Sequence, residues 1–267
     1  MATLLATGRA EAFALKHTSH GQSLHWEEPR VTFVIDPSVE AAVPGGADAV
    51  ARAVRGWSAM SGAPVLATQV GPGGGEAKYD GQNTILIAPQ GFAPAGNALA
   101  VTVVTLDDST GAILDTDVVI NGIHAFAVLA AQAQGHGEPI ATDGAGSGDG
   151  EAGAFDLEHV VSHETGHTLG LADEEGDREA VMYAYSRSGD ASNRAPATDD
   201  LDGIETLYPG TGTVPRAGCG GASVAGVSPR QDWTWAVMLL AMGAGAAALR
   251  HRGRRPYMEK GTDGGEV

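Results

Sequence analysis

Two histidines four residues apart, followed by a glycine and an aspartate, constrain the fold of this chain more than any other feature. The stretch reads His163-Glu164-Thr165-Gly166-His167-Thr168-Leu169-Gly170-Leu171-Ala172-Asp173. Helical residues four apart lie about 40° apart around the axis and one turn apart along it, so both imidazoles reach one metal ion. Gly170 lets the chain leave the helix with a positive φ, and the turn brings Asp173 back toward the metal. The pattern predicts a Zn²⁺ site with His163, His167 and Asp173 as ligands and a fourth position open.

Glu164 directly follows the first histidine and is predicted to point beside the metal rather than at it. That is the place for a general base that takes a proton from water at the zinc. A bare H-E-x-x-H also arises by chance, but the added glycine and aspartate make a coincidence far rarer. Residues 155–162 suit the start of the same helix, since Asp156 can cap it and the apolar residues 157, 160 and 161 form a stripe. His159 is interpreted as a neighbour of the site rather than as a ligand.

These motifs resemble those of the metzincin metallopeptidases and, among them, of the matrixins. The stretch Glu179-Ala180-Val181-Met182-Tyr183-Ala184-Tyr185 stands where metzincins have a methionine-containing turn, and residues 197–208 resemble the closing helix of matrixins. The resemblance covers about residues 30–210 and is specific over 155–208. It implies an α/β (α+β) fold, with a twisted mixed β-sheet, an active-site helix and a C-terminal helix. It also implies a zinc endopeptidase that binds a protein or peptide substrate.

Three positions in and around this turn qualify the resemblance. Most matrixins have histidine as third ligand, whereas Asp173 resembles the small bacterial snapalysin type; its charge should make water at the zinc slightly less acidic. Met182 is expected to form a packed hydrophobic floor beneath the histidines, with no chemistry of its own. Some metzincins place a tyrosine two residues after the methionine, where this chain has Ala184. Tyr183 and Tyr185 are therefore assigned to the substrate pocket, without an oxyanion role.

Composition limits the possible partners of the chain. A formal net charge of −17 over 267 residues argues against nucleic acid and fits a secreted protein. The single cysteine, Cys219, excludes an intramolecular disulfide, and it lies after the predicted catalytic domain, so a propeptide cysteine switch is not expected. The glycine-rich stretch 135–153 carries the carboxylates of Glu138, Asp143, Asp149 and Glu151. It could order on Ca²⁺ or overhang the cleft, although its spacing fits no EF-hand and a plain flexible loop is the simpler interpretation.

The two ends of the chain suggest export and anchoring. Residues 1–12 end in Ala-Glu-Ala and are interpreted as the remnant of a signal peptide whose start lies upstream. Residues 233–249 are uncharged and just long enough for a transmembrane helix. Four arginines follow within residues 250–255, so the positive-inside rule puts the tail, 250–267, in the cytoplasm and the catalytic domain, 13–210, outside.

The glycine-rich linker, residues 211–232, carries Cys219. A glycine–cysteine pair, an apolar span and an arginine cluster together resemble the C-terminal sorting signal of myxobacterial surface proteins. That resemblance implies a sorting peptidase as a partner, with anchoring or processing at Cys219. The polar segment after the arginines and the long spacer before the span depart from the family pattern.

Apolar runs before the metal motif predict the sheet. Strands are expected at 30–36, 64–70, 83–88, 98–106 and 113–121, and a helix at 47–60. The sheet edge beside the cleft is expected to bind peptide as an added strand, but the sequence does not say which strand forms it.

The function predicted from these patterns is hydrolysis of peptide bonds in extracellular proteins. A gluzincin-type aminopeptidase would have its third ligand well downstream on a second helix, and Gly170 and Met182 favour the metzincin turn instead. An intramembrane zinc protease is excluded by the charges of Glu158, Glu174 and Glu175. A surface-anchored zinc-containing binding or adhesion protein without turnover remains the alternative.

Overall fold

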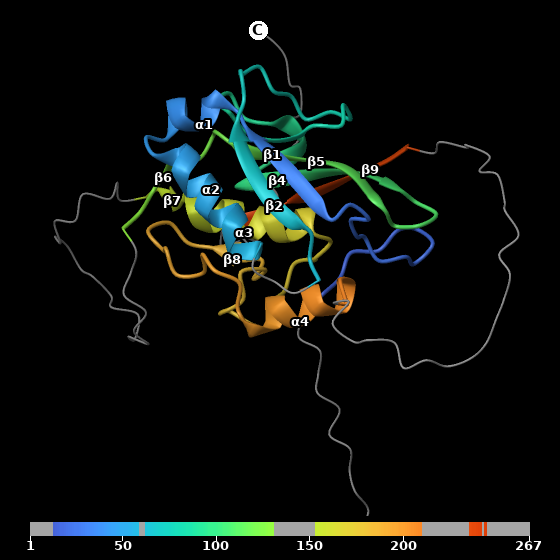
Figure 1. Cartoon of the computed structure of the whole chain (residues 1–267). Coiled ribbons are helices and arrows are strands. Elements are labelled where there is room, and N and C mark those ends of the chain that lie inside the picture. The colour runs from blue at the N-terminus through green and yellow to red at the C-terminus, as the bar shows by residue number, and fades with distance from the viewer. Residues whose placement is uncertain (1–12, 59–61, 131–152, 210–234, 242, 245–267) are drawn as a thin grey trace, which may run out of the picture.

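A mixed β-sheet forms the upper layer of the molecule, and helix α3 lies beneath it (Figure 1). The computed structural model describes residues 13–58, 62–130, 153–209, 235–241 and 243–244. The long strands are β1 (Arg30–Ile35), β2 (Val65–Val70), β3 (Asn83–Ala88), β4 (Ala100–Asp107), β5 (Ile113–Asn121) and β9 (Trp235–Ala241). The helices are α1 (Pro37–Ala42), α2 (Gly46–Trp57), η1 (Ala93–Ala95), α3 (Leu157–Thr168) and α4 (Thr198–Leu207). The two-residue strands are β6 (Phe126–Ala127), β7 (Phe155–Asp156), β8 (Tyr185–Ser186) and β10 (Gly243–Ala244).

The sheet has the strand order β2-β1-β3-β5-β4-β9. Strands β1, β2, β3 and β5 are mutually parallel neighbours, whereas β4 runs antiparallel to β5. The mixed sheet expected from the sequence is thus confirmed, and the expected strands at 83–88 and 113–121 match β3 and β5 residue for residue. Strands β4 and β5 are buried along nearly their whole length. The buried carboxylates of β5 accept backbone amides, as Asp115 does from Gly81 and Asp117 from Thr84.

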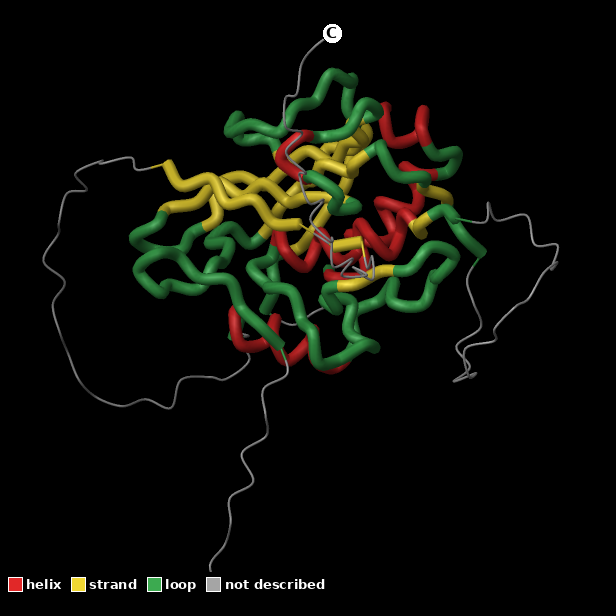
Figure 2. Tube along the Cα trace, turned by 180° about the vertical axis from the view of Figure 1, so that it is seen from behind, coloured by secondary structure: helices red, strands yellow, loops and turns green. Residues whose placement is uncertain are grey.

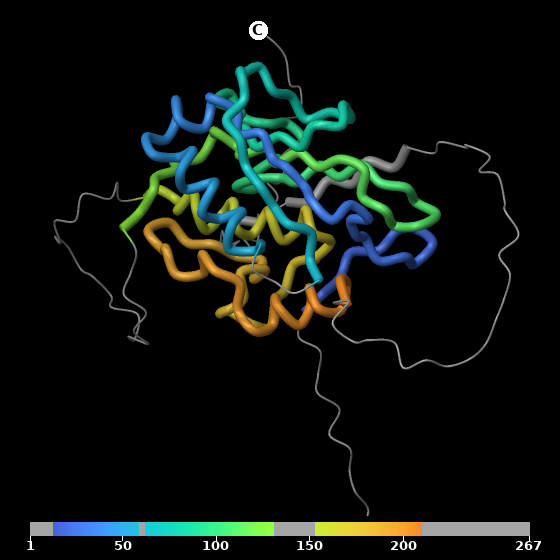
Figure 3. Tube along the Cα trace, in the orientation of Figure 1, coloured from blue at the N-terminus to red at the C-terminus, as the bar shows by residue number. Residues whose placement is uncertain are grey.

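Helices α2 and α3 pack against each other, and α3 also contacts β4 and β5. Trp57, at the end of α2, is fully buried, and its indole Nε1 donates to the carbonyl oxygen of Ser162 at 2.9 Å. The chain after α3 lies below it, on the side opposite the sheet, and ends in α4 (Figure 3). Helix α3 is therefore enclosed by the sheet, by α2 and by this lower segment.

The sequence did not predict the short helix α1, because Pro37 was interpreted only as the end of a strand. Proline fits the first turn of a helix, where its missing N–H has no partner in any case. Asp36 caps this helix, since its side chain accepts the Ser38 amide at 2.8 Å.

Within the run 233–249, where a transmembrane helix was expected, the described residues form strands. Residues Trp235–Ala241 form β9, which pairs antiparallel with β4. None of the helices in the described ranges is both long and apolar enough to cross a membrane. A short apolar run does not distinguish strand from helix by periodicity, and the free edge of β4 supplies backbone partners for a strand. Residues 1–12, the linker 211–232 with Cys219, and the tail 250–267 lie outside the described residues.

Candidate metal centre

The N-terminus of α3 is fixed by the N-cap residue expected from the sequence. Asp156 accepts the His159 amide at 2.9 Å and receives two hydrogen bonds of 2.7 Å from the guanidinium of Arg194. All twelve residues of α3 are buried, so its side chains meet protein on every face. A helix held in this way presents its histidines in one fixed orientation.

Gly170 ends the helix as the sequence predicts. Its φ is +102°, and a Cβ at this position would lie 2.2 Å from the carbonyl oxygen of Leu24. The Leu171 amide returns to the Gly166 carbonyl oxygen at 3.1 Å, which closes the turn. Only glycine fits here, for both conformational and steric reasons.

The turn brings three predicted ligand atoms together, and we call His163, His167 and Asp173 the metal group. The two Nε2 atoms lie 3.1 Å apart, and Asp173 Oδ1 lies 3.2 Å and 3.4 Å from them. Tetrahedral zinc with bonds of about 2.0–2.1 Å separates its ligands by roughly 3.3 Å. The triangle in this structure therefore fits one zinc ion, and within the described ranges no other three such side chains converge in this way.

Backbone carbonyls orient both imidazoles. His163 Nδ1 lies 2.8 Å from the Val181 oxygen, and His167 Nδ1 lies 2.9 Å from the Leu171 oxygen. Because a carbonyl oxygen only accepts, each Nδ1 carries the proton and each Nε2 directs its lone pair toward the shared point. Both side chains are completely buried, whereas that of Asp173 is 35% exposed, so solvent reaches the metal group from the aspartate side.

Glu164 lies on the same helix and is fully buried. Its two carboxylate oxygens have different surroundings. Its Oε2 accepts a hydrogen bond of 2.6 Å from the Thr102 hydroxyl, while Oε1 is buried and has no hydrogen-bond partner among the described residues. Burial raises the pKa of Glu164 to about 7. A buried carboxylate oxygen without a donor is suited to accept a proton from a ligand bound beside it.

Lys16 was missed by the sequence analysis and contributes a positive charge to the site. Its amide donates to the Gly170 carbonyl at 2.9 Å, and the Ala172 amide donates back to Ala14 at 2.8 Å, so residues 14–16 run along the metal-group turn. Burial lowers the pKa of Lys16, while the charges of Asp173 and Glu164 oppose that shift. The ammonium group is thus close enough to balance part of their negative charge.

Met182, which the sequence analysis expected to pack beneath the histidines, is buried against α3 at Gly166. It is 3% exposed, and a Cβ on Gly166 would lie 2.2 Å from its sulfur. Asp200, at the start of α4, holds this turn by accepting the amides of Val181 at 2.8 Å and Met182 at 3.0 Å. The carbonyl oxygen of Val181 accepts the hydrogen bond from His163 Nδ1. Val181 therefore links Asp200 of α4 to a ligand of the metal group.

The fold and these motifs agree with a comparison to known families, in which a model described as matrixin matches residues 61–209, more than half of the chain. The chain belongs to the matrixin family. This matrixin is 38% identical over 65 residues to matrix metalloproteinase-27 of Tupaia belangeri, which is 24% of this chain and 12% of that protein. It is 37% identical over 60 residues to human matrilysin, which is 22% of each. The matched part thus spans well under two thirds of either relative.

Beyond the methionine turn, this matrixin has a hollow of about 300 Å³ lined by Tyr183, Tyr185 and the residues that follow them. The two tyrosine rings meet edge to face at 5.5 Å. His159 lies at the wall of this hollow, with Nδ1 2.7 Å from the Asn193 oxygen, and so stands apart from the metal group. Both tyrosines thus line one hollow, and their assignment to a substrate pocket stays a prediction.

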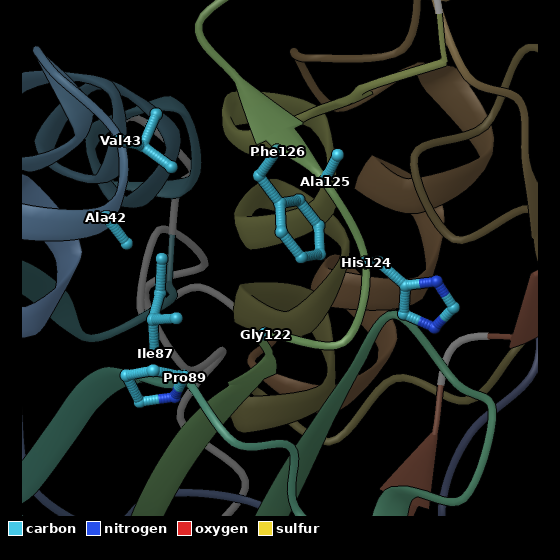
Figure 4. Close-up of a pocket in the computed structure, with 8 residues that line it drawn as sticks. All are labelled: Ala42, Val43, Ile87, Pro89, Gly122, His124, Ala125 and Phe126. Carbon is cyan, nitrogen blue, oxygen red and sulfur yellow. The ribbon is translucent and has the colours of Figure 1, made fainter.

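A second hollow of this matrixin, about 280 Å³, lies between α1 and the segment before β6 (Figure 4). It is lined by Ala42, Val43, Ile87, Pro89, Gly122, His124, Ala125 and Phe126. None of these residues belongs to the metal group or to the tyrosine hollow. Cys219 and nearly all of the stretch 135–153, where a calcium site was considered, lie outside the described residues.

Proposed function

We propose that this matrixin is a zinc-dependent endopeptidase that hydrolyses peptide bonds of extracellular proteins. The observation that carries the proposal is the buried metal group with the unpartnered oxygen of Glu164 beside it. Three protein ligands with a fourth position open, next to a general base, are typical of catalytic rather than structural zinc sites. The likeness to matrix metalloproteinase-27 and matrilysin supports the same activity.

His163, His167 and Asp173 would hold the ion, which when bound supplies Lewis-acid polarisation of the scissile carbonyl and acidifies water. Glu164 accepts the proton of the attacking water through its unpartnered Oε1. It then donates that proton to the nitrogen of the leaving amine as the peptide bond breaks. A pKa raised by burial to about 7 suits a group that must both take and return a proton near neutral pH.

Thr102 and Lys16 support this step without touching the proton themselves. The Thr102 hydroxyl holds Oε2, so that Oε1 remains free to act. Lys16 offsets part of the negative charge that an aspartate ligand adds in place of a histidine. We therefore regard both as positioning residues for the reaction.

The peptide would pair with β4 and place a side chain in the tyrosine hollow. Strand β4 is the last strand of the sheet before β9 and lies above α3, where Thr102 contacts Glu164. Backbone pairing along a sheet edge provides affinity, and a side-chain pocket beside it provides selectivity. We therefore assign the substrate-binding edge, which the sequence left open, to β4 as part of this proposal.

An extracellular location is part of the proposal, and its support is the acidic composition together with the alanine-rich ending of residues 1–12. Calcium binding by the stretch 135–153 and processing at Cys219 by a sorting peptidase stay predictions of the sequence. A membrane anchor at 233–249 is not proposed, because part of that run forms β9.

Hydrolysis of unstructured casein by the full chain tests the function. We expect cleavage that is lost with a zinc chelator and restored by added Zn²⁺. Glu164→Gln should keep one zinc per chain by metal analysis but lose most hydrolysis, His163→Ala should lose zinc as well, and Glu205→Gln, an exposed change on α4, should resemble the parent. A folded, zinc-loaded protein that cleaves neither casein nor a random peptide library, even when β9 is displaced from β4, would instead support a binding protein without turnover.

A further inference from the structure

Strand β4 has two neighbours, β5 on one side and β9 on the other. Strand β5 belongs to the continuous domain, whereas β9 comes from residues 235–241, joined to α4 through residues 210–234. Without β9, the second side of β4 would be a free sheet edge, with unpaired N–H and C=O groups. That is the edge on which we place the substrate peptide.

The register of β9 on β4 places it opposite Thr102, the residue that contacts the proposed base Glu164. All seven residues pair antiparallel with β4, and Leu240 is opposite Thr102. Thr102 is the residue whose hydroxyl lies 2.6 Å from Glu164 Oε2. Seen from behind, the sheet edge with these strands lies directly above α3 (Figure 2). The backbone of β9 therefore reaches the part of β4 that adjoins the metal group.

The same segment then pairs on the other side of the site. Gly243 and Ala244 form β10, which runs parallel to Tyr185 and Ser186 of β8. Strand β8 follows the methionine turn, where the Ala184 amide donates to Glu174, the residue next to the ligand Asp173. Residues 235–241 thus pair with β4 and residues 243–244 with β8, so the segment pairs on both sides of the site as an extended peptide would.

We propose that residues 235–241 and 243–244 are an internal ligand of the substrate groove and that they restrain hydrolysis of other peptides. The pairing argument rests on the structure alone, whereas the restraint of hydrolysis rests on the proposed function. A tethered segment competes at an effective concentration in the millimolar range for a flexible linker of suitable length. A chain of the length of residues 210–234 spans at most roughly 80–90 Å when fully extended. Free substrates at micromolar concentration would compete poorly.

This restraint needs no cysteine. The chain has one cysteine, Cys219, in the linker, so the occupant of the groove contributes backbone pairing rather than a thiolate ligand. Release would follow from any event that removes β9 from β4 and β10 from β8, such as cleavage within the linker.

The test uses the full chain with Leu239→Pro/Leu240→Pro. Successive amides of a strand point to opposite sides, so one of two neighbouring residues donates toward β4, and proline there removes the donor. Leu239→Val/Leu240→Val is the matched control, since it keeps both amides and favours the strand. Both are compared with the parent.

Two measurements are made on each zinc-loaded protein. Hydrogen exchange of residues 100–107 reports whether the second side of β4 is paired, and it needs no turnover. We expect fast exchange of about half of these amides in the proline variant only. Initial rates on a quenched fluorescent peptide at micromolar concentration should rise at least tenfold in the proline variant and stay parental in the valine control.

Equal exchange of β4 in the parent and the proline variant would overturn the proposal. So would parental protection that disappears on dilution, because the occupant would then be a second copy of the chain. Opening of β4 without a rise in hydrolysis of an active parent would overturn the restraint. If no protein shows chelator-sensitive hydrolysis although β4 opens as expected, the proposed endopeptidase function fails and the internal pairing stands.

Discussion

Thr102 Oγ1 lies 2.6 Å from Glu164 Oε2 and 3.2 Å from the carbonyl oxygen of the same residue. One hydroxyl on β4 thus joins the sheet edge to the buried carboxylate beside the metal group. Thr102 and Glu164 are both completely buried, so water does not replace this contact if it is lost. Thr102 therefore holds the side chain of the proposed base, Glu164, from β4, the strand along which the substrate is expected to pair.

Thr102→Val should lower kcat/KM by roughly 10- to 100-fold. The two side chains have nearly the same shape, and a hydrogen bond to a charged group contributes about 1.5–3 kcal/mol. Zinc content should be unchanged, because the hydroxyl does not touch the metal group. Thr102→Ser keeps the donor and should stay within a few-fold of the parent. Parental kinetics in the valine variant would mean that Thr102 only fills space.

Gly166→Ala should lower the free energy of unfolding by about 1–2 kcal/mol. A Cβ here would lie 2.2 Å from the Met182 sulfur and 3.0 Å from the Trp57 ring. Overpacking of this kind costs about 1–3 kcal/mol, more than the roughly 1 kcal/mol that alanine contributes to a helix. Urea unfolding of the zinc-loaded proteins measures the difference.

Gly56→Ala is the matched control on α2, since its Cβ would lie 3.6 Å from Pro196, an ordinary contact. It should be neutral or stabilise the protein by up to about 1 kcal/mol. Met182→Ala also destabilises the protein, but the double variant should lose less stability than the sum of the two single losses, because the overpacked sulfur is then removed. Additive effects of these two changes would contradict the packing contact.

The sequence predicts the local parts of this site and not the distant ones. The two histidines, the cap at Asp156 and the turn at Gly170 follow from spacing and φ preference within one helix. Thr102 is 62 residues from Glu164, and Lys16 is farther still, so their contacts depend on how the strands are arranged. Nothing in the local pattern around either residue indicates a role. Residues Trp235–Ala241, within the run expected to span a membrane, pair instead with β4, a long-range contact that an apolar run does not indicate.

Asp200→Ala should destabilise the protein by about 3 kcal/mol and weaken zinc binding. Its carboxylate accepts three amides, from Val181, Met182 and, at 2.7 Å, Ala197. Leaving these buried donors without an acceptor costs about 1–3 kcal/mol each before relaxation. Zinc binding should suffer because the Val181 carbonyl orients His163. Urea unfolding and a zinc titration measure the two effects, with Glu205→Ala as a control on the same helix.

A loss of stability in Asp200→Ala with unchanged zinc affinity would contradict the coupling through Val181. Asp200→Asn should fall between the parent and the alanine variant, since one oxygen remains to accept an amide.

Asp199 should make the protein less stable as pH rises from about 4 to 6. Burial and the neighbouring charge of Asp200 raise its pKa to about 6, above the value of about 3.9 for an unfolded chain. The folded state therefore holds this proton over a pH range in which the unfolded state has released it. The stability that protonated Asp199 adds to the folded state is complete below pH 4, declines as pH rises, and is lost above about 6.

Asp199→Asn should remove this slope, so that the stability of the variant relative to the parent grows between pH 4 and pH 7. We expect a relative gain of about 1 kcal/mol or less, because the side chain is partly exposed and solvent screens it. The positive end of the α4 dipole favours a charge at this position by about 0.3–1 kcal/mol and acts in the opposite direction. Urea unfolding at pH 4.5, 6 and 7.5 shows whether burial and the acidic neighbours or the helix dipole dominates. The exposed change Glu205→Gln is the control. A relative stability that falls with pH would mean that the helix terminus outweighs burial and the acidic neighbours.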